Sequence, residues 1–234
     1  MKVKLVSYTK SCINEINESE KREDGKVGVE QKEQSLQDII AYCARVSNPS
    51  NQYNTETNEK LIGYLIKNKH WSPFEMVNIC IEIESTRDII RQILRHRSFS
   101  FQEFSQRYAV ADLGFEYKEA RLQDTKNRQN SIEMSDEKEE LKKEWIHKQK
   151  EIANLAQENY QWALSNGIAK EQARAVLPEG MTMSKIYMNG TLRSWIHYIE
   201  LRSCNGTQKE HRDIAIACTN AIEPIFPISK FIFE

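Results

Sequence analysis

The stretch from Val77 to Glu84 alternates apolar and polar residues, so one face of the extended chain is hydrophobic. This alternation predicts a half-buried strand, with a core on one side of a sheet. The next residues, Ser85 to Asp88, resemble a capping box and predict that a helix begins there. Four apolar residues form the buried face of that helix, Ile89, Ile90, Ile93 and Leu94. A strand that leads directly into an amphipathic helix favours a mixed fold.

The rest of the chain supplies further elements of both kinds. Alternation predicts a strand at residues 3–8, and residues 183–188 fit a strand or a helix. Apolar residues at helical spacing predict helices at residues 39–46, 59–69, 169–176, 192–202 and 209–222. Another helix is expected to continue from the charged stretch through Tyr160 and to be ended by Asn166-Gly167. No internal repeat or glycine-rich linker divides the chain. We therefore expect one α/β (α+β) domain over residues 1–234, in which a small antiparallel sheet is flanked by long helices.

Two regions are dominated by polar residues. Residues 11–36 are polar and acidic and contain Gly25 and Gly28, so we expect an excursion on the surface. Residues 118–150 are dense in both charges, and the stretch from Glu139 to Glu144 is expected to form a solvated helix face. Neither region suggests a role in function.

The composition bears on several classes of protein. A formal net charge of −1 argues against a protein that holds nucleic acid mainly through its overall field. No apolar run approaches ~18 residues, so no membrane span is expected, and the first residues are too short and mixed for a secretory signal. The five cysteines form no C-x-x-C pair, so we expect no metal site and reduced thiols in a cytoplasmic protein. For a viral protein, that compartment would be the host cytoplasm.

One segment, residues 91–108, concentrates positive charge and hydroxyl groups. Its first 17 positions hold five cationic or near-cationic side chains, Arg91, Arg95, His96, Arg97 and Arg107. Arginine forks and serine hydroxyls recognise phosphate, so a phosphorylated small molecule is one natural ligand. The alternative is a solvated basic helix end, which the helix dipole favours in any protein. Charge alone does not separate these two interpretations.

The spacing in this segment resembles that of the flavin-dependent thymidylate synthases, in which Arg-His-Arg is followed, after seven residues, by a serine. Here the tripeptide is Arg95 to Arg97 and the serine is Ser105. Three more elements resemble the family in the same order: His70-Trp71-Ser72-Pro73-Phe74-Glu75, then Gln172-Ala173-Arg174-Ala175-Val176-Leu177-Pro178, then Arg193 to Arg202 followed by Gln208 and Glu210. One tripeptide would be a weak match, whereas four ordered elements over residues 70–212 are a specific one.

The family makes dTMP from dUMP, and the resemblance implies the same ligands here. They are dUMP as substrate, 5,10-methylenetetrahydrofolate as carbon donor, FAD as cofactor and NADPH as its reductant. By position, the residues expected to contact FAD are Ser72, Arg95, His96, Arg97, Glu103, Thr191, Arg193 and His197. Those expected to hold dUMP are Gln92, Arg95, Glu103, Phe104, Ser105, Gln106, Arg107, Arg174 and Arg202. Arg202 is the implied catalytic residue, because an arginine stays charged and can stabilise negative charge that develops on the uracil ring.

Some of these residues have structural alternatives. Ser105 suits a phosphate ligand better than a nucleophile, and His96 could serve as a base or bind the flavin. Arg174 could instead face the carbonyl groups at the end of its helix, and His197 could be a half-buried structural histidine. Two positions differ from the residues common in the family, Thr191 where many members have Asn and Gly206 where His is frequent.

Helix geometry bears on assembly. Arg193 and His197 are four residues apart and share a face. Arg202 lies nine positions beyond Arg193, about 2.5 turns at ~3.6 residues per turn, and so points the other way. We therefore expect the two faces to serve different active sites in an oligomer. The family forms homotetramers with shared sites, which implies a homotetramer with no nucleic-acid or membrane partner.

Two alternative functions remain open. The cluster from Arg91 to Arg107 could belong to a nucleic-acid-binding module, which predicts a wider basic surface than a nearly neutral chain provides. The chain could also be a flavoprotein that oxidises NADPH without methyl transfer, although Ser105, Arg174 and Arg202 argue against this. The sequence assigns no residue to the folate.

Overall fold

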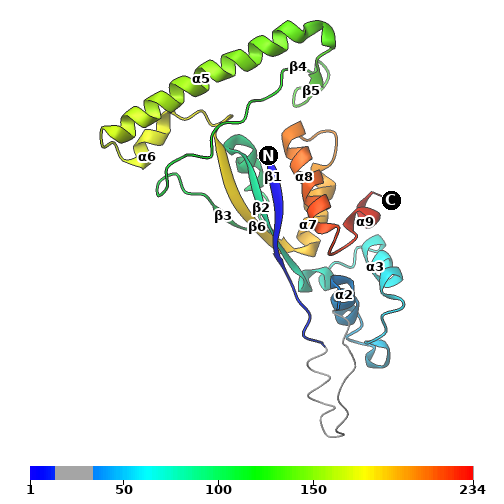
Figure 1. Ribbon diagram of the computed structural model, residues 1–234. Coiled ribbons are helices and arrows are strands. Elements are labelled where there is room, and N and C mark those ends of the chain that lie inside the picture. Colours follow the sequence, from blue (N-terminus) through cyan, green and yellow to red (C-terminus); the bar gives the residue numbers. More distant parts are fainter. Residues whose placement is uncertain (14–33, 234) are drawn as a thin grey trace.

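The computed structural model describes residues 1–13 and 34–233, so most of the excursion expected at residues 11–36 lies outside the described residues. At its centre is a four-stranded antiparallel sheet in the order β1-β2-β6-β3. The strands are β1 (Lys2–Tyr8), β2 (Asn78–Thr86), β6 (Met183–Thr191) and β3 (Ser100–Glu103). Two helices, α7 (Leu192–Arg202) and α8 (Lys209–Ile222), pack beside the sheet (Figure 1). This arrangement confirms the expected mixture of a small antiparallel sheet and helices.

Shorter helices surround one end of the sheet. Helix α2 (Leu36–Ala44) packs against both α3 (Asn58–Lys67) and the 3-10 turn η2 (Ser72–Met76). Between α2 and α3 lies a second 3-10 turn, η1 (Pro49–Asn51). The remaining short elements are α4 (Arg87–Ile93), which follows β2 directly, and α9 (Ile228–Ile232) near the end of the chain.

A long helix, α5 (Glu139–Ser165), lies across one end of the molecule and away from the sheet (Figure 1). Before it come the hairpin strands β4 (Arg121–Gln123) and β5 (Ser131–Glu133) and the turn η3 (Asp136–Lys138). After it come α6 (Lys170–Ala173) and the 3-10 turn η4 (Arg174–Val176). A small apolar cluster around Tyr160, Ala163 and Ala173 packs α5 against its neighbours.

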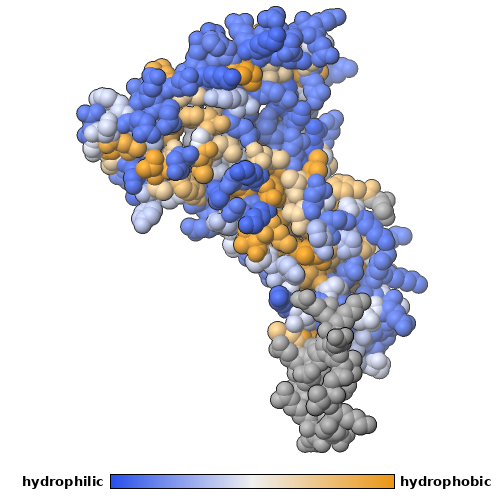
Figure 2. Space-filling view, viewed as in Figure 1, coloured by the Kyte–Doolittle hydropathy of each residue, from blue (hydrophilic) through white to orange (hydrophobic). Residues whose placement is uncertain are grey.

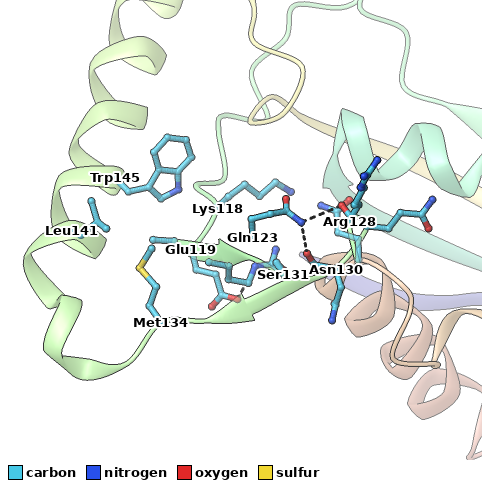
Figure 3. Close-up of a pocket in the computed structure, with 13 residues that line it drawn as sticks. Lys118, Glu119, Gln123, Arg128, Asn130, Ser131, Met134, Leu141 and Trp145 are labelled. Atoms are coloured by element: carbon cyan, nitrogen blue, oxygen red, sulfur yellow. Dashed lines mark hydrogen bonds and ion pairs between the residues drawn. The ribbon is translucent and has the colours of Figure 1, made fainter. Parts of the chain in front are cut away.

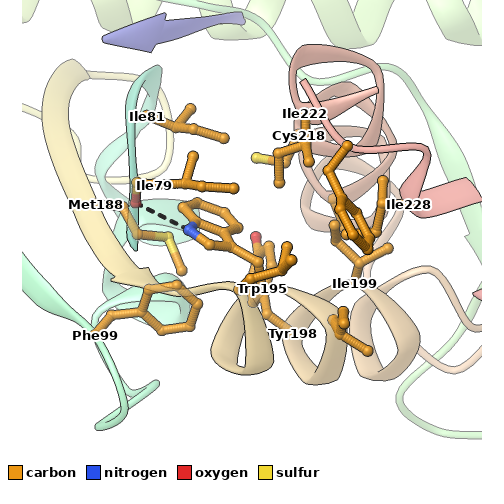
Figure 4. Packing of buried hydrophobic residues seen from close by; sticks show 14 of the residues in the cluster. Ile79, Ile81, Phe99, Met188, Trp195, Tyr198, Ile199, Cys218, Ile222 and Ile228 are labelled. Carbon is orange, nitrogen blue, oxygen red and sulfur yellow. Dashed lines mark hydrogen bonds between the residues drawn. The ribbon is translucent and has the colours of Figure 1, made fainter. Parts of the chain in front are cut away.

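The main core lies between the sheet and α7 and α8. Alternate residues of β2 and β6 point into it, including Ile79, Ile81 and Met188, and all three are fully buried. Each such side chain contributes roughly 1.5–3 kcal/mol to folding. Trp195 of α7 is buried among them, and its indole nitrogen donates a hydrogen bond to the carbonyl oxygen of Ile79 at 3.0 Å (Figure 4). Trp195 is therefore a core residue.

Most expected elements are confirmed, and two helices, at residues 192–202 and 209–222, have the predicted bounds. The ambiguous residues 183–188 belong to the strand β6, which pairs on both edges. The predicted capping box at residues 85–88 is wrong: Ser85 lies in the strand, and the Thr86 hydroxyl accepts a bond from Lys118 Nζ at 2.7 Å instead of capping the helix. Strand β3, the β4–β5 hairpin and α9 were not predicted.

Strand β6 approaches the core so closely at Gly190 that a side chain would collide with Phe99. An added Cβ would press into the Phe99 ring, and that ring is itself packed against Trp195 at 4.9 Å between centroids. We therefore expect Gly190→Ala to lower the free energy of unfolding by about 1–3 kcal/mol, as overpacking of cores does. Urea denaturation followed by circular dichroism would measure it. Gly180→Ala is the control, because nothing lies within 4 Å of its added Cβ; equal effects of the two changes would contradict the account.

Candidate functional site

The Arg-His-Arg turn follows α4, and its three side chains differ in their exposure to solvent. Arg95 and Arg97 are exposed, whereas His96 is half-buried. The ring of His96 meets the edge of Tyr198, with centroids 4.9 Å apart. Arg202, the last residue of α7, donates from Nε to His96 Nε2 at 2.9 Å. The structure thus joins two predicted site residues that lie 106 positions apart.

This bond requires His96 to be neutral. An arginine has no acceptor to offer, so Nε2 must carry a lone pair and the ring proton must sit on Nδ1. Burial, and then the nearby charge of Arg202, lower the pKa of His96 to about 4. At neutral pH, His96 is therefore a fixed acceptor that orients Arg202, and it adds no positive charge.

A second buried histidine, His211 of α8, lies beside this pair. Its ring is 6.2 Å from that of His96, and burial, followed by Arg202 and His96, lowers its pKa to about 3. Its Nδ1 lies 3.3 Å from Gln92 Oε1, so Nδ1 carries the proton and donates. Nε2 is buried without a hydrogen-bond partner among the described residues. His211 was not predicted as a site residue; its position directly after Gln208-Lys209-Glu210 is the signal that could have indicated it.

A chain of hydrogen bonds leads from His211 towards the β4–β5 hairpin. Gln92 Nε2 donates to Gln208 Oε1 at 2.8 Å, and Gln208 Nε2 donates to Glu210 Oε2 at 2.9 Å. The other oxygen of Glu210 accepts a bond from Arg121, which is paired with it. Gln92, a predicted dUMP ligand, is therefore held at both ends of its amide.

A second group of predicted residues gathers where η2 meets the start of α7. Arg193 pairs with Glu75, and the His197 ring meets Trp71 edge-on with centroids 4.6 Å apart. Burial lowers the pKa of His197. Thr191 caps α7, because its hydroxyl accepts from the amide of Ser194 at 3.3 Å. Ser72 is exposed at the start of η2.

A third group forms after β3 and at the end of α6. Arg107 donates to Glu171 Oε2 at 3.2 Å, and Arg174 donates to the carbonyl oxygen of the same Glu171 at 3.2 Å. Arg174 therefore makes the contact expected under the alternative interpretation, in which its side chain faces the end of its own helix. Ser105 is exposed, and Gln106 is buried with Nε2 unpartnered among the described residues.

Two predicted residues lie at the end of β3, beside β6. Glu103 ends β3 and lies 3.6 Å from Arg87, and Ser184 donates a long bond to it at 3.5 Å. The amide of Phe104 donates to the carbonyl oxygen of Lys185 at 2.8 Å, which extends the β3–β6 pairing by one residue.

The three groups remain separate in one chain. Across residues 1–13 and 34–233, no hydrogen bond or ion pair joins the His96–Arg202 pair to either the Arg193 group or the Arg107–Arg174 group. Arg202 and the pair Arg193 and His197 contact different neighbours, as the helix geometry predicts. One chain therefore supplies separate walls of the expected site.

Two other kinds of feature are absent from the same part of the chain. No helix there is both long enough and apolar enough to span a bilayer. No group of three or more His, Cys, Asp or Glu side chains in the described ranges is placed to hold a metal ion.

Comparison with known proteins gives consistent matches. The sequence model of the family described as "Thymidylate synthase complementing protein" matches residues 29–228. A probable flavin-dependent thymidylate synthase of Paramecium bursaria Chlorella virus 1 is 45% identical over 227 residues, which are 97% of this chain and 96% of the relative. A flavin-dependent thymidylate synthase of Synechocystis sp. is 48% identical over 194 residues, 82% of this chain and 87% of the relative. The crystal structure of a UMP/dUMP methylase from Streptomyces cacaoi, bound with 5-Br dUMP, has the same fold, with a TM-score of 0.77, 24% identity, and coverage of 99% of this chain and 93% of that one.

The buried histidines predict a dependence of stability on pH. The pKa of His211 is about 3 in the folded chain, below the ordinary value of 6.5, so between these values the unfolded chain binds more protons. The free energy of unfolding should therefore fall as pH drops below 6.5, by up to about 1.4 kcal/mol per pH unit for this histidine. His211→Asn should make that decline shallower in urea denaturation between pH 7 and pH 4.5. His147→Gln, a change at an exposed histidine, should leave the slope unchanged; identical slopes for both variants would refute the assignment.

Proposed function

The chain belongs to the thymidylate synthase complementing protein family, the flavin-dependent thymidylate synthases, and we propose on that premise that it converts dUMP to dTMP. In this proposal, 5,10-methylenetetrahydrofolate supplies the carbon and NADPH supplies the reducing equivalents through FAD. We also propose that residues 1–234 form one domain with this activity. The cytoplasmic location expected from the cysteine pattern stays a prediction. The observation that carries the proposal is the bond between Arg202 and a neutral His96.

That hydrogen bond leaves part of the Arg202 guanidinium group available to a ligand. Its Nε is occupied by His96, while its two terminal nitrogens make no hydrogen bond or ion pair within the described ranges. A uracil ring presents N3 between two carbonyl oxygens, and a planar guanidinium fork suits such an edge. A fixed positive charge there stabilises negative charge on the ring, which makes the ring carbon C5 nucleophilic.

The cysteines offer no competing nucleophile. Burial raises the pKa of Cys43, of Cys80 and, to well above its usual range, of Cys218, so these thiols stay protonated at neutral pH. The remaining two, Cys12 and Cys204, are exposed and free. Activation of the ring by charge at Arg202 needs no enzyme thiolate, which agrees with this set.

We place the phosphate of dUMP at the third group. Arg107 and Arg174 converge on Glu171, Arg107 on its carboxylate and Arg174 on its carbonyl oxygen, so an incoming phosphate could replace the carboxylate between two guanidinium groups. The unpartnered Nε2 of Gln106 is a buried donor that an anion or carbonyl group would satisfy. The solved methylase structure with 5-Br dUMP supports a pyrimidine nucleotide as the class of ligand for this fold.

We place FAD against the second group and the exposed arginines. Arg95, Arg97 and Ser72 are exposed, and they offer charge and a hydroxyl group for a diphosphate. The edge-on pair of Trp71 and His197 offers an aromatic surface for a ring system. These residue types fit a flavin dinucleotide, which supplies hydride chemistry when bound. Within this chain, Glu75 holds Arg193 in place beside that surface.

We propose that the active sites are completed by assembly into a homotetramer, because the three groups lie apart in one chain. Helix α5 carries a fitting surface, which we call the α5 stripe: Ile152, Leu155 and Trp162. Their spacing puts them on one face of the helix, and they are 54%, 59% and 61% exposed. Figure 2 shows further apolar residues gathered on the visible surface below α5. An apolar surface of this kind is typical of contacts between subunits.

The alternatives receive less support. A nucleic-acid-binding module needs a continuous basic surface, but Arg91, Arg107 and Arg193 are each paired with a glutamate. A flavoprotein without methyl transfer would not need the Arg202–His96 bond beside Gln92. The favoured function is therefore thymidylate synthesis.

Replacing Arg202 tests the proposed chemistry. Arg202→Lys keeps the charge but loses the Nε bond to His96 and the planar fork, so we expect dTMP formation to fall roughly 10²–10³-fold in kcat, as for loss of one charge-stabilising donor. Bound FAD and its reduction by NADPH should persist. Stopped-flow absorbance and chromatography of dTMP would measure both. Arg212→Lys, on α8 near the surface, is the control; a variant at Arg202 with unchanged dTMP formation would overturn its assigned role.

A charge placed in the α5 stripe tests the proposed assembly. Leu155→Glu should dissociate the oligomer and reduce dTMP formation, because burying an unpaired charge in a contact is costly. Sedimentation velocity and activity would be compared for the same samples. Asn154→Glu adds the same charge one position away, outside the stripe, and should do neither. If the native protein sediments as an active monomer, shared active sites are ruled out.

A further inference from the structure

A pocket of about 540 Å³ lies between the β4–β5 hairpin and the start of α5. The segment from Lys118 to Arg121 forms one wall, and the hairpin forms a second (Figure 3). The third wall is apolar and comes from Met134, Leu141 and Trp145. Two residues of its lining, Arg121 and Gln208, also belong to the hydrogen-bond chain that leads from His211.

The pocket carries an excess of positive charge. Its lining contains the cations Lys118, Arg121 and Arg128 against the single anion Glu119. Lys118 is engaged with Thr86 and lies 3.6 Å from Asp88, and Arg121 is engaged with Glu210. Arg128 differs, because its side chain forms no hydrogen bond or ion pair anywhere in the described ranges. It is the cation available to a ligand.

Arg128 lies in a loop that is stabilised by several hydrogen bonds between its own residues. Asp124 accepts bonds from the amides of Lys126 and Asn127 at 2.8 and 3.1 Å and from the Asn130 side chain at 3.1 Å. These bonds lower the pKa of Asp124. The Gln123 amide nitrogen lies within bonding distance of three carbonyl oxygens across the loop, including that of Arg128 at 3.2 Å (Figure 3). A loop fixed in this way presents its arginine at a reduced entropic cost of binding.

The apolar wall suits a flat ring. Leu141 and Trp145 are 46% and 44% exposed even though both line the pocket. In Figure 3, Trp145 and Leu141 project from α5 on the side opposite Arg128 and Asn130. An aromatic ring of a ligand can pack on the indole while an anionic group on the same ligand reaches the arginine.

The pocket is connected to the proposed reaction site. Gln208 lines the pocket and also accepts a bond from Gln92, the predicted dUMP ligand, at 2.8 Å. Arg121 lines it too and pairs with Glu210, which holds the other end of Gln208. A molecule with one end in the pocket would have to pass Gln208 to reach the residues around His96.

We propose that this pocket binds the distal half of an extended cosubstrate, a flat ring that carries an anionic group. This rests on the proposed function, which has two cosubstrates of that chemistry. One is the folate, whose p-aminobenzoyl ring is joined to a glutamate that bears carboxylates, and the other is NADPH, whose adenosine bears a 2′-phosphate. Trp145 packs on the ring, and Arg128 binds the anion.

Isolated fragments distinguish the two sources. Tryptophan fluorescence and calorimetry of the full-length protein, with its bound flavin, would be titrated with p-aminobenzoyl-L-glutamate and, separately, with adenosine 2′,5′-bisphosphate. We expect one of the two to bind and to quench Trp145, with the quenching lost in Trp145→Leu. Binding of the first assigns the pocket to the folate, and binding of the second assigns it to NADPH. Binding of neither overturns the proposal.

A matched pair of variants tests the role of Arg128. Arg128→Gln should weaken binding of the fragment roughly tenfold to a hundredfold, the range expected for loss of one bond to a charged group. It should raise the KM of the corresponding cosubstrate by a similar factor and leave the KM of dUMP unchanged. Lys126→Gln removes the same charge from the same loop but outside the pocket lining, and should change neither. Equal weakening by both variants would show a general effect of charge and contradict a site at Arg128.

These measurements distinguish failure of the proposed pocket from failure of the proposed function. If the protein forms no dTMP but binds a fragment through Arg128, the pocket stands and the proposed function fails. If it forms dTMP but neither fragment binds, the function stands and the pocket assignment fails. Sedimentation of Trp145→Leu completes the test, because dissociation of the oligomer together with absence of fragment binding would identify the pocket as a contact between chains.

Discussion

The pairing of β2 with β6 determines where the functional residues lie. The nine residues of each strand pair antiparallel, from Asn78 opposite Thr191 to Thr86 opposite Met183, and a helix follows each strand without a loop. The two helices therefore start at opposite ends of the sheet and run towards one another. His96, three residues beyond the end of α4, and Arg202, the last residue of α7, are joined there by a hydrogen bond. A register shift of one residue would exchange the faces of the strand and separate them.

Charge near this bond follows from burial. Burial, and then the nearby charge of Arg202, disfavour a second positive charge there, so His96 and His211 are both neutral at neutral pH. Each neutral ring then has one donor and one acceptor, which fixes the direction of its hydrogen bonds. The chain of hydrogen bonds from His211 runs through Gln92 and Gln208 and ends at the pair of Glu210 and Arg121. One network therefore joins the residues around His96 to the β4–β5 hairpin. A change at the hairpin can therefore reach the residues that position the proposed substrate.

The sequence predicted local features well and their meeting points poorly. Helix α7 was predicted with its observed bounds because its apolar residues repeat at helical spacing. Met183 to Met188 was ambiguous because both periodicities fit a short apolar run, and only pairing on two sides makes it a strand. The β4–β5 hairpin was missed because its order comes from Asp124 and Gln123 binding loop atoms, in a stretch that reads as charged surface. The resemblance named Arg202 and His96, but neither composition nor spacing could show that they touch. His211 was not predicted, although it directly follows Gln208-Lys209-Glu210.

The central claim is that Arg202, set by a neutral His96, activates a uracil ring for reductive methylation by a flavin. The most direct measurement is the flavin absorbance of the purified protein, followed without oxygen. The account predicts a yellow protein that is bleached by NADPH and regains its colour, with one dTMP formed per flavin, only when dUMP and methylenetetrahydrofolate are both present. A protein that takes up no FAD, or whose reduced flavin is reoxidised by neither substrate mixture, would contradict it.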